Sequence, residues 1–202
     1  MKLSVLICTI PQRKKLLNDL VEGLENQIEK HNFQSEVEIL ISSKLNISTG
    51  AKRNLLIQEA QGDFIVFIDD DDEVFDYYLE EIITCINKNP KIDCIGINGI
   101  ISFSGENPKD WFISKDYGRW YETSDAYYRT PNHISPIRKN IAEKIGFPDF
   151  HHGEDHAYSM GVLPFLKYEA KIEKPLYHYK FQQSYQAPSS NDPHEPYRPA
   201  FR

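Results

Sequence analysis

The 202-residue chain has few cysteines, no long apolar segment and no excess of basic residues. Its three cysteines, Cys8, Cys85 and Cys94, form neither a CxxC pair nor an even set, which argues against a disulfide scaffold or a zinc ribbon. No apolar run approaches the roughly 20 residues that cross a bilayer. The basic residues 13–15 follow the short apolar start, where a secreted protein would have a cleavage site. We therefore expect a cytoplasmic protein without a transmembrane segment.

Acidic residues outnumber basic ones by 30 to 23, and the formal net charge is −7. A general nucleic-acid binder needs a basic face to displace counterions from phosphates, so nucleic acid is not an expected partner. The GxGxxG, GxxxxGK[ST] and GxSxG signatures are also missing. Their absence argues against a dinucleotide-dependent dehydrogenase, a P-loop NTPase and a serine hydrolase.

What the chain does contain is an alternation of apolar runs and amphipathic segments. The expected strands are 3–8, 37–41, 64–68 and 94–101, and the expected helices are 16–28, 49–60 (capped by Thr49) and 78–86. This alternation predicts an α/β fold with a mainly parallel central sheet flanked by helices. Ligands bind such sheets at the carboxyl ends of the strands, so the residues after Cys8, Ile41 and Ile68 should converge on one crevice.

The second half of the chain is less regular. Residues 111–128 are dense in aromatics and lack a clear period, so we expect a loop or an irregular flap there. Short helices are expected over 136–145 and 155–163, followed by a strand over 171–179. Four prolines in residues 186–202 indicate an extended or disordered tail.

Four consecutive aspartates, Asp69 to Asp72, follow the expected third strand. Like charges in a partly dry crevice repel one another strongly unless a cation is present. Oxygen ligands of this kind suit Mn²⁺ or Mg²⁺, which keep open positions for substrate phosphates. The alternative is an acidic loop that caps the helix beginning near Asp76. A calcium loop is disfavoured because Val74 stands where the sixth-position glycine is required.

Two further polar clusters are candidates for chemistry. In the segment 151–156, His152 and His156 could bind zinc, although the sequence HGEDH is not HExxH and implies no third ligand. Asp155 in the same segment could cap a helix, or act as a general base if it faces the crevice. The second cluster is basic and lies in residues 50–54, near a helix start, where backbone N–H groups and the helix dipole favour phosphate.

Taken in order, these segments resemble a family-2 glycosyltransferase, an inverting enzyme of the GT-A fold. The matching stretches are SVLICT at 4–9, STGAKRN at 48–54, GDFIVFIDDDD at 62–72, NHISPIR at 132–138, IGFP at 145–148, GED at 153–155 and PLYHY at 175–179. The resemblance implies a compact soluble enzyme that moves a hexose from a nucleoside-diphosphate sugar, with UDP as the nucleotide. The acceptor would be a hydroxyl of a glycan, a lipid-linked sugar, a protein or another molecule.

The resemblance also implies roles for individual residues. The donor-binding residues would be Thr9, Pro11, Arg13, Ser42, Lys52, Arg53, Asp69 and Asp70. Asp71 and Asp69 would hold Mn²⁺ or Mg²⁺, with His178 as a further candidate ligand. Ser42-Ser43-Lys44 stands where the family usually carries acidic residues that read the nucleobase, which leaves the base open.

On the acceptor side, the resemblance makes Asp155 the general base, with Glu154 beside it. One displacement at the anomeric carbon would then invert its configuration. Five aromatic side chains are candidates for stacking on a sugar or for simple packing: Trp111, Trp120, Tyr121, Tyr127 and Tyr128.

One glycosyltransferase domain is therefore expected over 1–185, with a nucleotide-sugar half at 1–101 and an acceptor half at 102–185. Two alternatives remain open at this point. One is a Mg²⁺-dependent phosphohydrolase of the haloacid-dehalogenase type, whose DxDx[TV] motif the run from Asp69 to Glu73 fits loosely. The other is a non-catalytic module that binds a nucleotide or a glycan.

Overall fold

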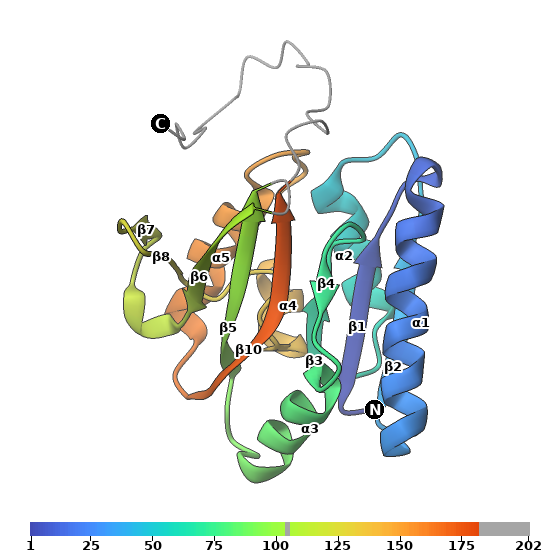
Figure 1. The fold of residues 1–202 in the computed structure, drawn as a ribbon, viewed down its shortest axis with the longest axis horizontal. Coiled ribbons are helices and arrows are strands. Elements are labelled where there is room, and N and C mark those ends of the chain that lie inside the picture. Colours follow the sequence, from blue (N-terminus) through green and yellow to red (C-terminus); the bar gives the residue numbers. More distant parts are fainter. Residues whose placement is uncertain (104–105, 182–202) are drawn as a thin grey trace.

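The computed structural model describes residues 1–103 and 106–181, which form one domain around a ten-stranded sheet (Figure 1). The expected tail at 186–202 lies outside the described residues. The strands are β1 (Leu3–Cys8), β2 (Val37–Ser42), β3 (Phe64–Phe67), β4 (Glu73–Val74), β5 (Cys94–Phe103), β6 (Glu106–Ile113), β7 (Tyr121–Glu122), β8 (Ala126–Arg129), β9 (Ile137–Arg138) and β10 (Glu169–Phe181). The helices are α1 (Lys14–His31), α2 (Thr49–Glu59), α3 (Tyr78–Lys88), α4 (Lys139–Ile145) and α5 (Glu154–Val162).

The strands follow the order β2-β1-β3-β9-β5-β6-β8-β7, and β10 pairs with β5 and β4. β1 runs parallel to β2 and β3, and β10 runs parallel to β5 over nearly its whole length. Antiparallel pairs involve the short strands β4, β7 and β9 and the β5–β6 hairpin. The predicted α/β fold with a mainly parallel central sheet is thus confirmed.

Two apolar layers cover the two faces of the sheet. Val5 and Ile7 of β1 belong to the buried cluster that contains side chains of α1 and α3, and Leu6 between them belongs to the cluster that contains side chains of α2, α4 and α5. This alternation is the consequence of the strand period of two. It explains why the early strands read as unbroken apolar runs, since both of their faces are buried.

Three expectations for secondary structure need correction. Residues 111–128 are not an irregular flap, because they contain the end of β6, all of β7 and most of β8. Buried Trp111 and Ile113 alternate with Phe112 along β6, a short period-two signal that the surrounding aromatics concealed. The helix expected over 136–145 starts later, at Lys139 of α4. The two residues before it form β9, which pairs with β3 and β5. The N-cap of α2 is Ser48, whose hydroxyl accepts from the N–H of Ala51 at 3.0 Å, and not Thr49.

β10 is longer than expected and changes its neighbours along its length. At its start, Glu169 Oε2 accepts from the Ser114 hydroxyl, which follows β6, at 2.6 Å. After register shifts around Pro175, Tyr177 lies opposite Val74 of β4. The strand therefore passes from the β6 side of β5 to the side of β3 and β4, as its path in Figure 1 shows.

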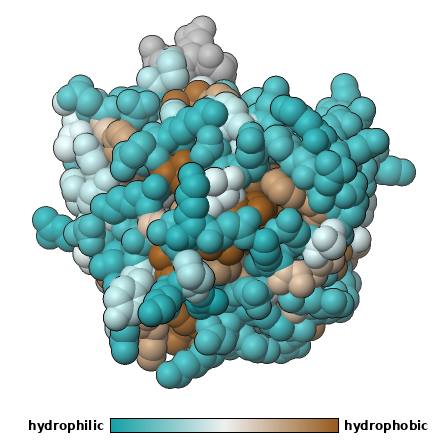
Figure 2. All heavy atoms as spheres, turned by 90° about the horizontal axis from the view of Figure 1, so that it is seen from below, coloured by the Kyte–Doolittle hydropathy of each residue, from teal (hydrophilic) through white to brown (hydrophobic). Residues whose placement is uncertain are grey.

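The surface seen from below in Figure 2 is mostly hydrophilic, with small separate apolar areas. No helix in the described part of the chain combines the length and the apolar character that a bilayer crossing requires.

We expect Gly50→Ala to lower the free energy of unfolding by about 1–3 kcal/mol, the usual cost of overpacking. Gly50 lies in the first turn of α2, and a Cβ atom there would overlap the carbonyl oxygen of Pro148. The control is Gly23→Ala on α1, where nothing lies within 4 Å of a Cβ atom. Because alanine favours a helix, this variant should gain about 0.5–1 kcal/mol. Urea unfolding measures both, and effects of the same sign would contradict the close contact of α2 with Pro148.

Candidate active site

The carboxyl ends of three parallel strands meet at one edge of the sheet, as predicted. The N–H of Thr9, after β1, donates to the carbonyl oxygen of Ser42 at the end of β2, at 3.0 Å. The Thr9 hydroxyl donates to Asp70 Oδ2, after β3, at 2.6 Å. The aspartate run closes on itself, because the N–H of Asp72 donates to the carbonyl oxygen of Asp69 at 3.1 Å. We call residues Asp69–Asp72 the aspartate turn.

Two members of the aspartate turn are buried and bonded to the protein. Asp70 accepts from Thr9 on one oxygen and from Arg13 Nη1 on the other, at 2.8 Å. Asp72 accepts from the Tyr177 hydroxyl at 2.7 Å and from the N–H of Lys180 at 2.8 Å. Burial raises the pKa of Asp72 well above its usual value. These two side chains therefore hold the turn in place.

The other two aspartates face outward, and each has about a third of its side chain exposed. Asp69 Oδ1 lies 3.3 Å from Arg53 Nη2, and its Oδ2 lies 3.2 Å from His133 Nε2. Burial opposes ionisation, but His133 and Arg53 outweigh it and hold the pKa of Asp69 below its usual value. Asp71 Oδ2 lies 3.0 Å from Arg13 Nη2, and burial raises the pKa of Asp71 in spite of that arginine.

His133 is a site residue that the sequence reasoning missed. Its carbonyl oxygen accepts from the N–H of Phe67 at 2.8 Å, so the segment before β9 runs beside the end of β3. This contact brings the imidazole to Asp69. The segment 132–138 was recognised as part of a family pattern, but no periodicity indicated that one of its side chains reaches the aspartate turn.

A buried ion pair joins α2 to α5 beneath this edge of the sheet. Arg53 Nη1 donates to Glu154 Oε1 at 2.6 Å, and the two side chains are 5% and 7% exposed. The guanidinium also lies 5.5 Å from the centre of the Phe67 ring and 5.2 Å from that of Phe147. Burial raises the pKa of Glu154, and Arg53 acts in the opposite direction. Arg53 thus connects the aspartate turn to the first residue of α5.

Asp155 follows Glu154 in the first turn of α5, and its side chain is partly exposed. Its carboxylate accepts from the N–H of its own helix neighbour, His156, at 2.8 Å. It forms no ion pair with any of the described residues. A carboxylate with an accessible oxygen beside a network of paired charges has the environment that a general base requires.

Only one of the five aromatic candidates lies against the helix of Asp155. Trp120 Nε1 donates to the hydroxyls of Thr130 and Ser159 at 2.9 and 3.2 Å, and its ring meets that of His156 edge to face at 4.9 Å. Trp111 and Tyr127 are buried in the core, so the structure assigns them to packing. Tyr121 and Tyr128 stack on each other at 4.7 Å.

Two of the other predicted residues, Lys52 and His178, contact other parts of the protein, whereas Pro11 is exposed. Lys52 is buried, and its ammonium donates to the carbonyl oxygen of Thr9 at 2.9 Å, which ties α2 to the turn after β1. Pro11 is exposed at the start of the short 3₁₀ turn Pro11–Arg13. His178 Nε2 lies 2.9 Å from the Ser102 hydroxyl, and its Nδ1 lies 3.6 Å from Glu73.

The aspartate turn fits a divalent cation in one specific way. Mg²⁺ commonly binds proteins through one or two carboxylates together with substrate phosphates. Asp71 is partly exposed and fits that mode, whereas Asp70 and Asp72 are buried and bonded on both oxygens. The described residues contain no cluster of three or more histidine, cysteine or carboxylate side chains suited to a metal, which leaves the zinc hypothesis for His152 and His156 without a third ligand.

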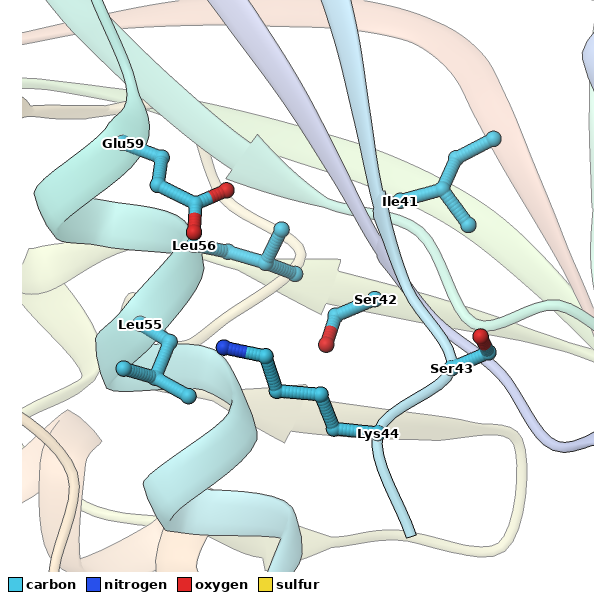
Figure 3. A pocket seen from close by; sticks show the side chains of 7 residues that line it. All are labelled: Ile41, Ser42, Ser43, Lys44, Leu55, Leu56 and Glu59. Carbon is cyan, nitrogen blue, oxygen red and sulfur yellow. The ribbon is translucent and has the colours of Figure 1, made fainter.

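A hollow of about 250 Å³ lies between the end of β2 and α2. Figure 3 shows Ser42 and Lys44 facing Leu55, Leu56 and Glu59 across it. The Ser42 hydroxyl oxygen is buried and has no hydrogen-bond partner among the described residues. An unpaired buried hydroxyl is costly, so this one is suited to bond an incoming polar group.

Comparisons with known proteins agree with this geometry. Residues 18–146 match the sequence profile of glycosyl transferase family 2. The "Putative glycosyltransferase EpsH" of Bacillus subtilis (strain 168) is 26% identical over an alignment of 159 residues, which covers 69% of this chain and 43% of that protein.

Two crystal structures of S. aureus TarS 1–349, one in complex with UDP-GlcNAc and one with UDP, superpose with a TM-score of 0.65 at 17% identity. Each likeness covers 90% of this chain, and it covers 59% and 61% of the respective TarS chains. The chain thus spans less than two thirds of these relatives. The likeness to TarS shows a shared fold.

We expect Arg53→Met to lower the free energy of unfolding by about 3–5 kcal/mol, because it leaves Glu154 as a buried charge without its partner. Adding Glu154→Gln should recover a large part of this loss, since the uncompensated charge is then removed. Denaturant unfolding of both variants tests this expectation. A double variant no more stable than Arg53→Met would show that the charge of Glu154 is not the source of the loss.

Proposed function

The chain belongs to glycosyl transferase family 2. We propose that it transfers a hexose from a nucleoside-diphosphate sugar to an acceptor hydroxyl, with metal assistance and inversion of configuration. One observation carries the proposal: Arg53 bonds both Asp69 of the aspartate turn and Glu154, the neighbour of Asp155. The groups suited to the donor and the group suited to the acceptor are therefore held at one edge of the sheet. Neither a phosphohydrolase nor a simple binding module requires this connection.

We place the diphosphate of the donor at the outward face of the aspartate turn. Arg13 and Arg53 supply fixed positive charge there, which would stabilise the negative charge that develops on the leaving nucleoside diphosphate. A bound Mn²⁺ or Mg²⁺ held by Asp71, with Asp69 next to it, would act as a Lewis acid toward the same oxygens. The TarS complexes with UDP-GlcNAc and UDP support a UDP-sugar as the donor.

The hollow between β2 and α2 is our candidate for the nucleoside end of the donor. Ser42 closes β2 next to Thr9, so this hollow adjoins the turn that carries the diphosphate charges. The unpaired Ser42 hydroxyl can donate or accept, whereas Lys44 can only donate. These groups differ from the acidic residues usual in the family and can serve the oxygen atoms of a base or a ribose.

On the acceptor side, Asp155 would accept the proton of the attacking hydroxyl. The acceptor oxygen forms a bond to the anomeric carbon, and the bond from that carbon to the diphosphate oxygen breaks on the opposite face. A single displacement of this kind converts an α-linked donor into a β-linked product. Glu154 is a positioning residue in this scheme, because its ion pair with Arg53 fixes the start of the helix that carries Asp155.

We expect Asp155→Asn to bind UDP and Mn²⁺ within about twofold of wild type and to lose at least about 100-fold in transfer rate, the usual contribution of a general base. Calorimetry measures binding. UDP release from UDP-hexoses with a panel of hydroxyl acceptors measures turnover, and NMR of the product reads its anomeric configuration. The matched control is Asp125→Asn on the exposed turn between β7 and β8, which should transfer normally. Near-normal transfer by Asp155→Asn would refute the base assignment.

Thermal unfolding with UDP, GDP, CDP and dTDP, each with Mn²⁺ and with a chelator, tests the donor site. Ligand at 100 times its Kd adds roughly 2.7 kcal/mol, which raises Tm by about 5–10 °C for a domain of this size. We expect a Mn²⁺-dependent rise with one nucleotide, lost in Asp71→Asn but kept in the exposed control Asp76→Asn. If none of the four nucleotides raises Tm, the proposed donor site is refuted.

A further inference from the structure

Both terminal nitrogens of the Arg13 guanidinium contact carboxylates of the aspartate turn. Nη1 donates to Asp70 Oδ1 at 2.8 Å, and Nη2 lies 3.0 Å from Asp71 Oδ2. The two carboxylates differ in burial, since the side chain of Asp70 is 2% exposed and that of Asp71 is 32% exposed. Nη1 thus bonds a buried carboxylate, and Nη2 contacts Asp71, the carboxylate that binds the metal in the proposed function.

The contact of Arg13 with Asp70 does not depend on its contact with Asp71. The second oxygen of Asp70 accepts from the Thr9 hydroxyl at 2.6 Å. Asp70 is therefore held in place by a bond that does not involve Asp71. The outer contact with Asp71 is nearer to solvent and is therefore the weaker of the two. Arg13 can release Asp71 while it keeps Asp70.

We propose that Arg13 is an internal counter-ion that excludes a divalent cation from Asp71 until the nucleotide arrives. The inference rests on the proposed function. A cation that binds Asp71 through Oδ2 must displace the guanidinium, and one that binds the other oxygen lies beside its positive charge. A diphosphate cancels that repulsion, because the released Nη2 faces its oxygens. Metal and nucleotide would then bind cooperatively, with Arg13 as the source of part of the coupling.

The cooperativity has a thermodynamic signature that a merely structural arginine would not give. Couplings between two ligands in proteins are commonly about 5–150-fold in affinity. Removal of the positive charge should strengthen binding of the metal alone and weaken binding of the nucleotide in the presence of metal. If Arg13 only supported the fold, its removal would weaken the binding of the metal alone and of the nucleotide alike.

The experiment measures Mn²⁺ binding by the EPR signal of the free ion, with and without saturating UDP. In Arg13→Gln we expect the Kd for Mn²⁺ alone to fall about fivefold or more and the coupling to UDP to shrink by a similar factor. The matched control is Lys14→Gln, which removes an equal charge from the next, exposed position. It should leave both constants near the wild-type values.

Two further variants keep the test decisive. Arg13→Lys retains a positive charge for buried Asp70 but cannot span two carboxylates. It should also bind Mn²⁺ alone more tightly than wild type, even if Arg13→Gln folds poorly. Adding Asp71→Asn to either variant should abolish the gain, since the freed carboxylate is its source.

The outcomes separate this inference from the proposed function. Wild-type protein that binds UDP with Mn²⁺, while neither Arg13 variant gains affinity for Mn²⁺ alone, would overturn the role of Arg13 only. A gain that persists with Asp71→Asn would do the same. Wild-type protein that binds neither Mn²⁺ nor UDP would overturn the proposed function, and the counter-ion role with it.

Discussion

The rest of the site depends on one buried guanidinium. Arg53 is nearly inaccessible and bonds carboxylates from two distant parts of the chain, Asp69 and Glu154. Burial of any one of these charges without a partner would be strongly unfavourable, so the three groups must assemble together. Their assembly fixes the distance between the end of β3 and the start of α5. The rings of Phe67 and Phe147 lie over the guanidinium and complete its surroundings.

The aspartate turn shows how four adjacent negative charges are accommodated in a folded protein. Four neighbouring carboxylates are divided between two functions, because Asp70 and Asp72 point inward to protein donors and Asp69 and Asp71 point outward to cations. The inward pair fixes the backbone through Thr9 and Tyr177. The outward pair is partly exposed and contacts cationic or imidazole side chains, those of Arg13, Arg53 and His133. The inward pair meets donors in two segments packed against the turn, the residues after β1 and the end of β10.

Much of this arrangement could be predicted from the sequence. The early strands are unbroken apolar runs, and their parallel order brings Thr9, Ser42 and the aspartate turn together by topology alone. Residues whose role depends on non-local packing could not be found in that way. His133 reaches Asp69 only because its segment runs beside β3, and the pairing of Arg53 with Glu154 spans 101 residues. The strands within 111–128 were missed because aromatic residues on both faces concealed their period.

The crossing of β10 has a consequence for the order in which the protein can mature. This strand leaves the β6 side of β5 and delivers Tyr177 and the N–H of Lys180 to Asp72, more than a hundred residues after the aspartate turn has been synthesised. On the ribosome, the amino-terminal strands can pair early, but the turn they carry is without its inward donors until the last strand emerges. The nascent chain can therefore pair its amino-terminal strands before it has a finished site.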